Sequence, residues 1–219
     1  MRPFFFLLNQ PRTTRIHESL KNIFAPSMQR IAIFASGKGS NAEAICKYFA
    51  QHPRYRVALL LCDKQEAGVY DVAKAFRVPA ISISGSYQNG NTLKAMLEMH
   101  DIHFILLAGY LRLFPVEVIN AWPGKILNIH PALLPQFGGK GMYGRHVHTA
   151  VINAGSSESG FTIHLVNPRY DEGKILFQEK IKVPPGTHPE TLHQLVNELE
   201  LQHYAPVAEK YFDQLNQKS

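Results

Sequence analysis

Short apolar runs alternate with amphipathic stretches along most of the chain. Runs of four to six mostly apolar residues indicate strands covered on both faces, at residues 30–35, 56–61, 80–83, 103–108 and 125–128. The stretches between them are typical of helices, at residues 42–49, 65–76 and 92–99 and from Pro115 onward, where a proline suits the first helical turn. Strands that alternate with helices predict an α/β fold with an open, mostly parallel sheet and helices on both faces.

The alternation of expected strands and helices ends in the last third of the chain. Residues 161–166 and 175–181 indicate successive strands joined by a turn-forming segment at 167–173, which predicts an antiparallel pair on the far side of the sheet. A long amphipathic helix is expected from Pro189 to about Leu215. The whole pattern predicts a Rossmann-like sheet with antiparallel strands late in the chain and a long C-terminal helix.

The length of 219 residues suits one domain. We expect that domain to span residues 28–219, with residues 1–27 as a disordered N-terminal extension. No apolar run approaches the ~20 residues that cross a bilayer, so we expect no membrane association. Cys46 and Cys62 form no CxxC pair and are typical of buried thiols in a reducing, cytoplasmic compartment.

The charge balance narrows the range of partners. The formal net charge is +6, but residues 1–27 carry four basic side chains against one acidic one. The remainder is only mildly basic, which argues against a nucleic-acid surface. A mild positive excess suits a small phosphorylated or carboxylated substrate.

A glycine-rich loop, Gly37-Lys38-Gly39-Ser40-Asn41, lies between the first expected strand and the first expected helix. Glycines let the backbone approach a ligand closely, and the free N–H groups of a helix start favour phosphate. Ser40 and Asn41 can cap the helix or bind the anion themselves. The spacing is not GxGxxG, so a single phosphate is favoured over a dinucleotide. An ordinary turn before a capped helix explains the same residues equally well.

Asn128 and His130 stand two residues apart at the end of the fifth expected strand, so their side chains should point the same way. Ligands of open parallel sheets bind beyond the carboxyl ends of the strands. A histidine there can move protons near neutral pH, and an asparagine amide can donate to a developing oxyanion. Taken by spacing alone, the two residues are better explained as partners of backbone groups at a loop entry.

Asp171 lies in the segment between the two late strands. A carboxylate beside an imidazole orients it and raises its pKa, but Asp is also common in exposed turns. Nothing in the spacing brings Asp171 to His130. His146 and His148 form an HxH pair, yet the spacing matches no zinc pattern, so we expect substrate contact or scaffold and no metal.

Four groups of motifs, each modest alone, occur in a specific order and spacing: Ser36-Gly37-Lys38-Gly39-Ser40-Asn41, Leu107-Ala108-Gly109-Tyr110-Leu111-Arg112, Leu127-Asn128-Ile129-His130-Pro131 with Leu133-Leu134-Pro135, and Thr162-Ile163-His164 with Asp171-Glu172-Gly173. Together they resemble the phosphoribosylglycinamide formyltransferase family. The resemblance extends over residues 28 to about 213. The resemblance implies an enzyme that uses 10-formyltetrahydrofolate as co-substrate in purine biosynthesis.

The resemblance also implies roles for individual residues. Gly39, Ser40 and Asn41 are similar to the loop that holds the ribose phosphate, and Glu200 is similar to a carboxylate that contacts the glycinamide substrate. Other positions correspond to the folate site and the catalytic trio. The folate site comprises Leu111, Arg112, Leu113, Phe114 and Asn128, with residues 167–173 as the opposite wall, and the trio comprises Asn128, His130 and Asp171.

The implied mechanism is attack of the substrate amine on the formyl carbon. Asn128 would donate to the developing oxyanion, and His130, raised in pKa by Asp171, would move protons. One segment departs from many members of the family, because residues 136–145 form a longer, glycine-rich loop. That loop puts phosphate contacts of Lys140 and His146 in question.

Three other functions share parts of this pattern. A formyltetrahydrofolate deformylase uses water in place of the amine, but usually carries an N-terminal regulatory domain for which 27 residues are too few. Methionyl-transfer-RNA formyltransferase adds a C-terminal nucleic-acid domain. A phosphate-binding regulatory protein would not need the full trio. We therefore expect a formyltransferase that acts on small molecules, as a monomer or homodimer.

Overall fold

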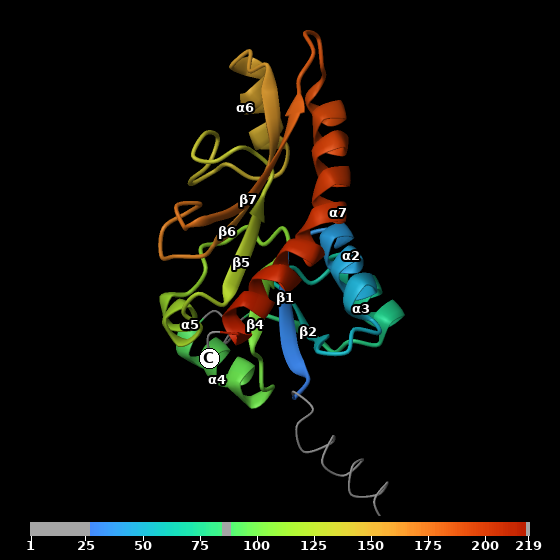
Figure 1. Ribbon diagram of the computed structural model, residues 1–219, viewed down its shortest axis with the longest axis vertical. Coiled ribbons are helices and arrows are strands. Elements are labelled where there is room, and N and C mark those ends of the chain that lie inside the picture. The colour runs from blue at the N-terminus through green and yellow to red at the C-terminus, as the bar shows by residue number, and fades with distance from the viewer. Residues whose placement is uncertain (1–26, 85–88, 218–219) are drawn as a thin grey trace, which may run out of the picture.

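The computed structural model describes residues 27–84 and 89–217 (Figure 1). The strands are β1 (Gln29–Ala35), β2 (Tyr55–Cys62), β3 (Ala80–Ser82), β4 (Phe104–Leu107), β5 (Ile126–His130), β6 (Glu158–Leu165) and β7 (Ile175–Lys182). The helices are α2 (Ser40–Phe49), α3 (Val69–Phe76), α4 (Gly90–Met99), α5 (Val116–Ala121), α6 (Arg145–Asn153) and α7 (Pro189–Asn216). The extension predicted for residues 1–27 lies outside the described residues, apart from Ser27.

The strands form one seven-stranded sheet in the order β3-β2-β1-β4-β5-β6-β7. The pairings from β3 to β5 are parallel, whereas β6 runs antiparallel to both β5 and β7. The predicted α/β sheet with late antiparallel strands is therefore confirmed. The strand order reverses between β1 and β4, and open sheets of this kind bind ligands beyond the carboxyl ends of the strands at such a reversal.

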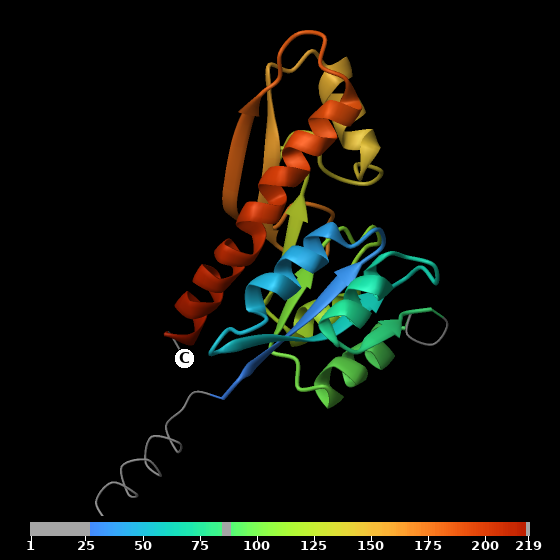
Figure 2. The same ribbon diagram turned by 90° about the vertical axis from the view of Figure 1, so that its right-hand side faces the viewer.

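Alternate residues of β1 point to opposite faces of the sheet and enter two separate cores. Ile31 and Ile33 pack with α2, α3 and α7, whereas Ala32 and Phe34 pack with α4 and α5. Figure 2 shows α7 crossing the strands on the face that it shares with α2. Two covered faces explain why β1 and β2 are apolar in the middle and carry their polar residues near the strand ends.

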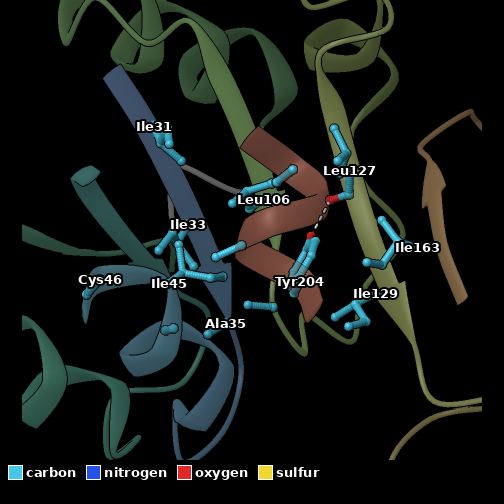
Figure 3. Packing of buried hydrophobic residues seen from close by; sticks show 14 of the residues in the cluster. Ile31, Ile33, Ala35, Ile45, Cys46, Leu106, Leu127, Ile129, Ile163 and Tyr204 are labelled. Atoms are coloured by element: carbon cyan, nitrogen blue, oxygen red, sulfur yellow. Dashed lines mark hydrogen bonds between the residues drawn. The ribbon is translucent and has the colours of Figure 1, made fainter. Parts of the chain in front are cut away.

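The Tyr204 hydroxyl connects α7 to two strands of the sheet. Tyr204 is buried, and its hydroxyl lies 2.9 Å from the Leu127 carbonyl and 3.1 Å from the Leu107 carbonyl (Figure 3). Both carbonyls belong to segments that end at the carboxyl edge of the sheet, on β5 and β4. The contact therefore helps to position the preceding turns of α7, which include Glu200, relative to that edge.

The structure contains one helix that the sequence pattern did not predict and shortens another. Helix α6 buries Val147, His148 and Val151. It begins directly after a glycine-rich segment, which does not indicate a helix start. Helix α3 begins at Val69, four residues later than expected, after Gly68. Within residues 27–84 and 89–217, no helix has both the length and the apolar character that a membrane span requires.

Candidate functional site

Strand β5 carries Asn128 and His130 to the carboxyl edge of the sheet. Its neighbouring residues Leu127 and Ile129 enter the core shared with α7, so the two polar side chains share the other direction, as the strand period predicts. His130 is 3% exposed and Asn128 is half-buried. Both line a cleft of about 760 Å³.

The segment between β6 and β7 brings Asp171 onto these two side chains. Asp171 Oδ2 lies 3.5 Å from His130 Nδ1, and Oδ1 accepts a 3.5 Å hydrogen bond from Asn128 Nδ2. Asp171 adopts a left-handed backbone conformation with φ of 56°, which is uncommon for a residue other than glycine. The structure thus brings together the three residues that spacing alone could not connect.

His164 joins this group from β6. The antiparallel register places it opposite Asn128, and its Nδ1 donates to the Leu165 carbonyl at 2.8 Å. That bond leaves Nε2 as the acceptor for Asn128 Nδ2 at 3.0 Å. From the sequence, His164 was only part of a motif, and its contact with Asn128 becomes visible through the pairing register between β5 and β6.

Burial and hydrogen bonding shift the pKa values of this group in opposing ways. Burial lowers the pKa of His130 below its usual value, although Asp171 and the Phe137 carbonyl act to raise it. The expectation that Asp171 would leave His130 with a raised pKa is therefore wrong, because desolvation of the imidazolium outweighs the attraction. Burial acts to raise the pKa of Asp171, but contacts with His164, His130 and Gly139 bring it below its usual value.

The loop before α2 forms a second part of the cleft. Gly39 has φ of 87°, and a Cβ there would lie 2.9 Å from the Val69 Cα, so the position requires glycine. Helix α2 begins at Ser40 without a side-chain cap, so the capping suggested for Ser40 and Asn41 is not observed. Uncapped N–H groups at a helix start favour an anion, in keeping with the phosphate alternative.

Glu200 reaches the same place from α7. It is 6% exposed, and its Oε2 accepts from Asn41 Nδ2 at 2.9 Å and from Asn197 Nδ2 at 3.2 Å. Burial raises its pKa. Asn41 Oδ1 is buried, and no hydrogen-bond partner for it exists among the described residues. A buried acceptor of this kind at the cleft wall suits a ligand that brings a donor.

The segment from Leu111 to Phe114 also lines the cleft. Leu111 N–H donates to Ser36 Oγ at 3.2 Å, and Arg112 pairs with Asp63 at 2.8 Å. Leu113 is exposed, whereas Phe114 is buried against Phe34. Val166, Tyr170 and other residues after β6 form the facing wall. The mixture of apolar side chains and backbone groups is suited to a flat aromatic ligand.

The two histidines of the HxH pair have different surroundings. His146 is exposed, whereas His148 is fully buried with Nε2 3.2 Å from His193 Nδ1. Burial, His193 and His130 together lower the pKa of His148 to about 4. Within the described ranges, no three or more His, Cys, Asp or Glu side chains are grouped as a metal site. That catalysis needs no metal stays a prediction.

The backbone of the glycine-rich loop after β5 contacts His130 and Asp171. His130 Nε2 donates to the Phe137 carbonyl at 2.8 Å, and Gly139 N–H donates to Asp171 Oδ2 at 2.9 Å. Lys140, which belongs to the same loop, also lines the cleft.

Comparison with known proteins gives one consistent picture. The model of the formyl transferase family matches residues 29–208. The chain is 40% identical over 178 residues to a chloroplastic phosphoribosylglycinamide formyltransferase from Arabidopsis thaliana, covering 78% of this chain and 61% of that relative's length. It is 37% identical to the phosphoribosylglycinamide formyltransferase of Bacillus subtilis, covering 82% of this chain and 93% of that one.

A solved structure agrees with these relatives. The glycinamide ribonucleotide transformylase 1 of Geobacillus kaustophilus is 35% identical and superposes with a TM-score of 0.75, covering 83% of this chain and 97% of that one.

Proposed function

Since this chain belongs to the formyl transferase family, we propose that it transfers the formyl group of 10-formyltetrahydrofolate to the amine of 5′-phosphoribosylglycinamide, a step of purine biosynthesis. The observation that carries the proposal is the meeting of Asn128, His130 and Asp171 in a cleft that also contains the start of α2. A donor, a proton carrier and a carboxylate together are what acyl transfer to an amine requires.

Two different groups of cleft residues would bind the two substrates. Gly39, Ser40 and Asn41 would hold the phosphate at the start of α2, with Glu200 facing the remainder of the phosphoribosyl substrate. Leu111, Arg112, Leu113 and Phe114 would line the folate's pterin ring, opposite the segment that carries Asp171. The two substrates would then meet at Asn128, which lines the same cleft.

Asn128 would stabilise the charge that develops on the formyl oxygen. One hydrogen of its amide is directed at His164 Nε2, which fixes the orientation of the side chain. Because Nδ2 carries two hydrogens, a second donor remains for the oxyanion, at the cost of the long contact with Asp171. A donor that is held in place before the reaction stabilises the transition state more than one that must reorient.

His130 would accept the proton that the amine loses and return it to the departing folate nitrogen. Its lowered pKa keeps the ring neutral at pH 7, ready to accept. The Nδ1 edge, which faces Asp171 at 3.5 Å, is more open to exchange than the Nε2 edge, which is bonded to Phe137 at 2.8 Å. Asp171 would stabilise the imidazolium while it lasts.

The test is an assay with 10-formyltetrahydrofolate in the presence and absence of 5′-phosphoribosylglycinamide. We expect release of tetrahydrofolate only when the amine is present, with one formylated product for each tetrahydrofolate. Release without the amine would indicate a hydrolase in which water takes its place. No release in either mixture would exclude both reactions.

A further inference from the structure

The loop after β5 contacts the His130–Asp171 pair through the backbone atoms of two of its residues, Phe137 and Gly139. The Phe137 carbonyl accepts from His130 Nε2 at 2.8 Å, and the Gly139 N–H donates to Asp171 Oδ2 at 2.9 Å. Between them, a Cβ on Gly138 would stand 3.3 Å from the Asp171 Cβ and 2.5 Å from Leu134 Cδ2. The middle residue therefore has little room for a side chain, and the loop fits closely around the pair.

The contacts of Phe137 and Gly139 both affect the protonation of the His130–Asp171 pair. Asp171 Oδ2 is both the acceptor for Gly139 and the oxygen that faces His130 Nδ1. Only a doubly protonated imidazole can donate to Asp171 and to the Phe137 carbonyl at once. The Phe137 carbonyl raises the pKa of His130, and the Gly139 amide lowers that of Asp171. Both effects offset part of the cost of charging a buried ring.

The loop reaches this position through unusual backbone conformations. Phe137 has φ of 55° and Gly139 has φ of 96°, both in the left-handed region. Such a conformation is strained for most residues and persists only where the surroundings enforce it. A Cβ on Gly139 would meet nothing within 4 Å, so glycine is needed there for its backbone angle alone.

We propose that the segment from Phe137 to Gly139 positions the His130–Asp171 pair, with Gly139 as the positioning residue whose amide holds the carboxylate against the imidazole. This inference rests on the proposed function, because it concerns the same proton carrier. It assigns a task to the backbone of the glycine-rich loop after β5.

The test compares Gly139→Ala with Gly186→Ala. Gly186 has φ of 82° and open space around its Cβ position, but it lies in the turn between β7 and α7. The two substitutions therefore impose similar backbone strain at different places. We expect similar losses in Tm, while Gly139→Ala alone lowers kcat, between about tenfold and about a hundredfold, as small misplacements of catalytic groups do. The KM for the folate should change little.

The pH dependence separates positioning from general loss of stability. In Gly139→Ala, Asp171 is held less firmly and raises the His130 pKa less, so the His130 limb of the kcat/KM profile should move to lower pH. Nitrogen NMR of the histidine rings should show the same shift for His130 in Gly139→Ala and none in Gly186→Ala. Unchanged His130 titration and kcat in folded Gly139→Ala would overturn the proposal.

The NMR measurement also separates this inference from the proposed function. If the wild-type protein transfers no formyl group but His130 still responds to Gly139→Ala alone, the positioning stands and the reaction is wrong. If the wild type transfers the group and both variants behave alike, the reaction stands and the positioning fails.

Discussion

Two clusters of histidine and carboxylate side chains lie against the two halves of α7. The cleft cluster consists of Asn128, His130, His164 and Asp171, with His148 and His193 beside it. The anchor network consists of His52, Arg54, Tyr55, Glu209 and Asp213, where Asp213 accepts from Arg54 at 2.7 Å and from Tyr55 at 2.6 Å and Glu209 faces His52 at 2.9 Å. Similar groups therefore occur twice in one protein.

The difference lies in burial and in charge balance. In the anchor network the Arg54 guanidinium is partly exposed, carries a permanent positive charge and lies within ion-pair distance of both carboxylates, 2.7 Å from Asp213 and 3.5 Å from Glu209. In the cleft cluster the partners of Asp171 are histidines buried to within a few per cent, and the Nδ1 of His148 has no partner in the described part of the chain. The first arrangement connects α7 to residues 52–55, whereas in the second burial lowers the pKa values of His130 and His148, and shifted pKa values of this kind are common at functional sites.

Replacing Asp171 should produce the largest difference between the two clusters. We expect Asp171→Asn to lower kcat/KM by about 10²–10⁴-fold, the usual worth of acid–base catalysis, with little change in Tm. Without its charge the pKa of His130 falls further, so the His130 limb should shift to lower pH. Full activity with an unchanged pH profile would remove Asp171 from the mechanism.

The next prediction concerns stability at mildly acidic pH. Burial depresses the pKa of His148 to about 4, below the ~6.5 of an unfolded histidine. Its contribution to the free energy of unfolding is therefore complete above about pH 6.5 and is lost as pH falls toward 4, on the order of 3 kcal/mol. The titratable side chains that act on His148 are those of His193 and His130, and Lys140 and Glu200 line the same cleft.

His148→Gln should remove much of this pH dependence, as measured by chemical unfolding at pH 7, 5.5 and 4. His146→Gln, an exposed position on the same helix, is the matched control and should follow the wild type. Identical slopes for wild type and both variants would show that His148 is not buried in its neutral form.

The anchor network should respond to pH in a different range. Partial burial acts to raise the pKa of Asp213, but hydrogen bonds from Tyr55 and Arg54 bring it below the usual value. The stabilisation is therefore present above about pH 4 and lost as pH falls further. Asp213→Asn should lower the free energy of unfolding by roughly 1–2 kcal/mol at pH 7, with kcat unchanged. A loss of activity without loss of stability would contradict the separation of the two clusters.

The smallest effect is expected from Tyr48, at the exposed edge of the anchor network. Its hydroxyl donates to Glu209, but its ring is 41% exposed, so solvent competes for the bond. Tyr48→Phe should lower the free energy of unfolding by about 0.5 kcal/mol. Tyr211→Phe, which removes the bond to the Gly124 carbonyl at a less exposed tyrosine, is the comparison. A loss above about 1.5 kcal/mol would show that the network acts as a cooperative unit.

The sequence predicted most elements of the fold because their signals are local. Five apolar runs became parallel strands with bounds within two residues of those expected, and the helix expected from Pro189 ends one residue beyond Leu215. Helix α6 was missed, because glycines precede it and a histidine, His148, occupies part of its buried face. The direction shared by Asn128 and His130 was also predictable, since a strand has a period of two.

The rest of the site depends on contacts between distant segments. Asp171 meets His130 only because β6 runs antiparallel to β5 and the following segment returns over its end. Gly139 contacts Asp171 across a sequence separation of 32 residues, and no pattern in either segment indicates it. The sign of the His130 pKa shift was wrong from sequence, because burial opposes the effect of Asp171 and burial is a property of the packed molecule. Local backbone geometry determines which way a side chain points, whereas desolvation and long-range hydrogen bonds exist only once the chain has folded.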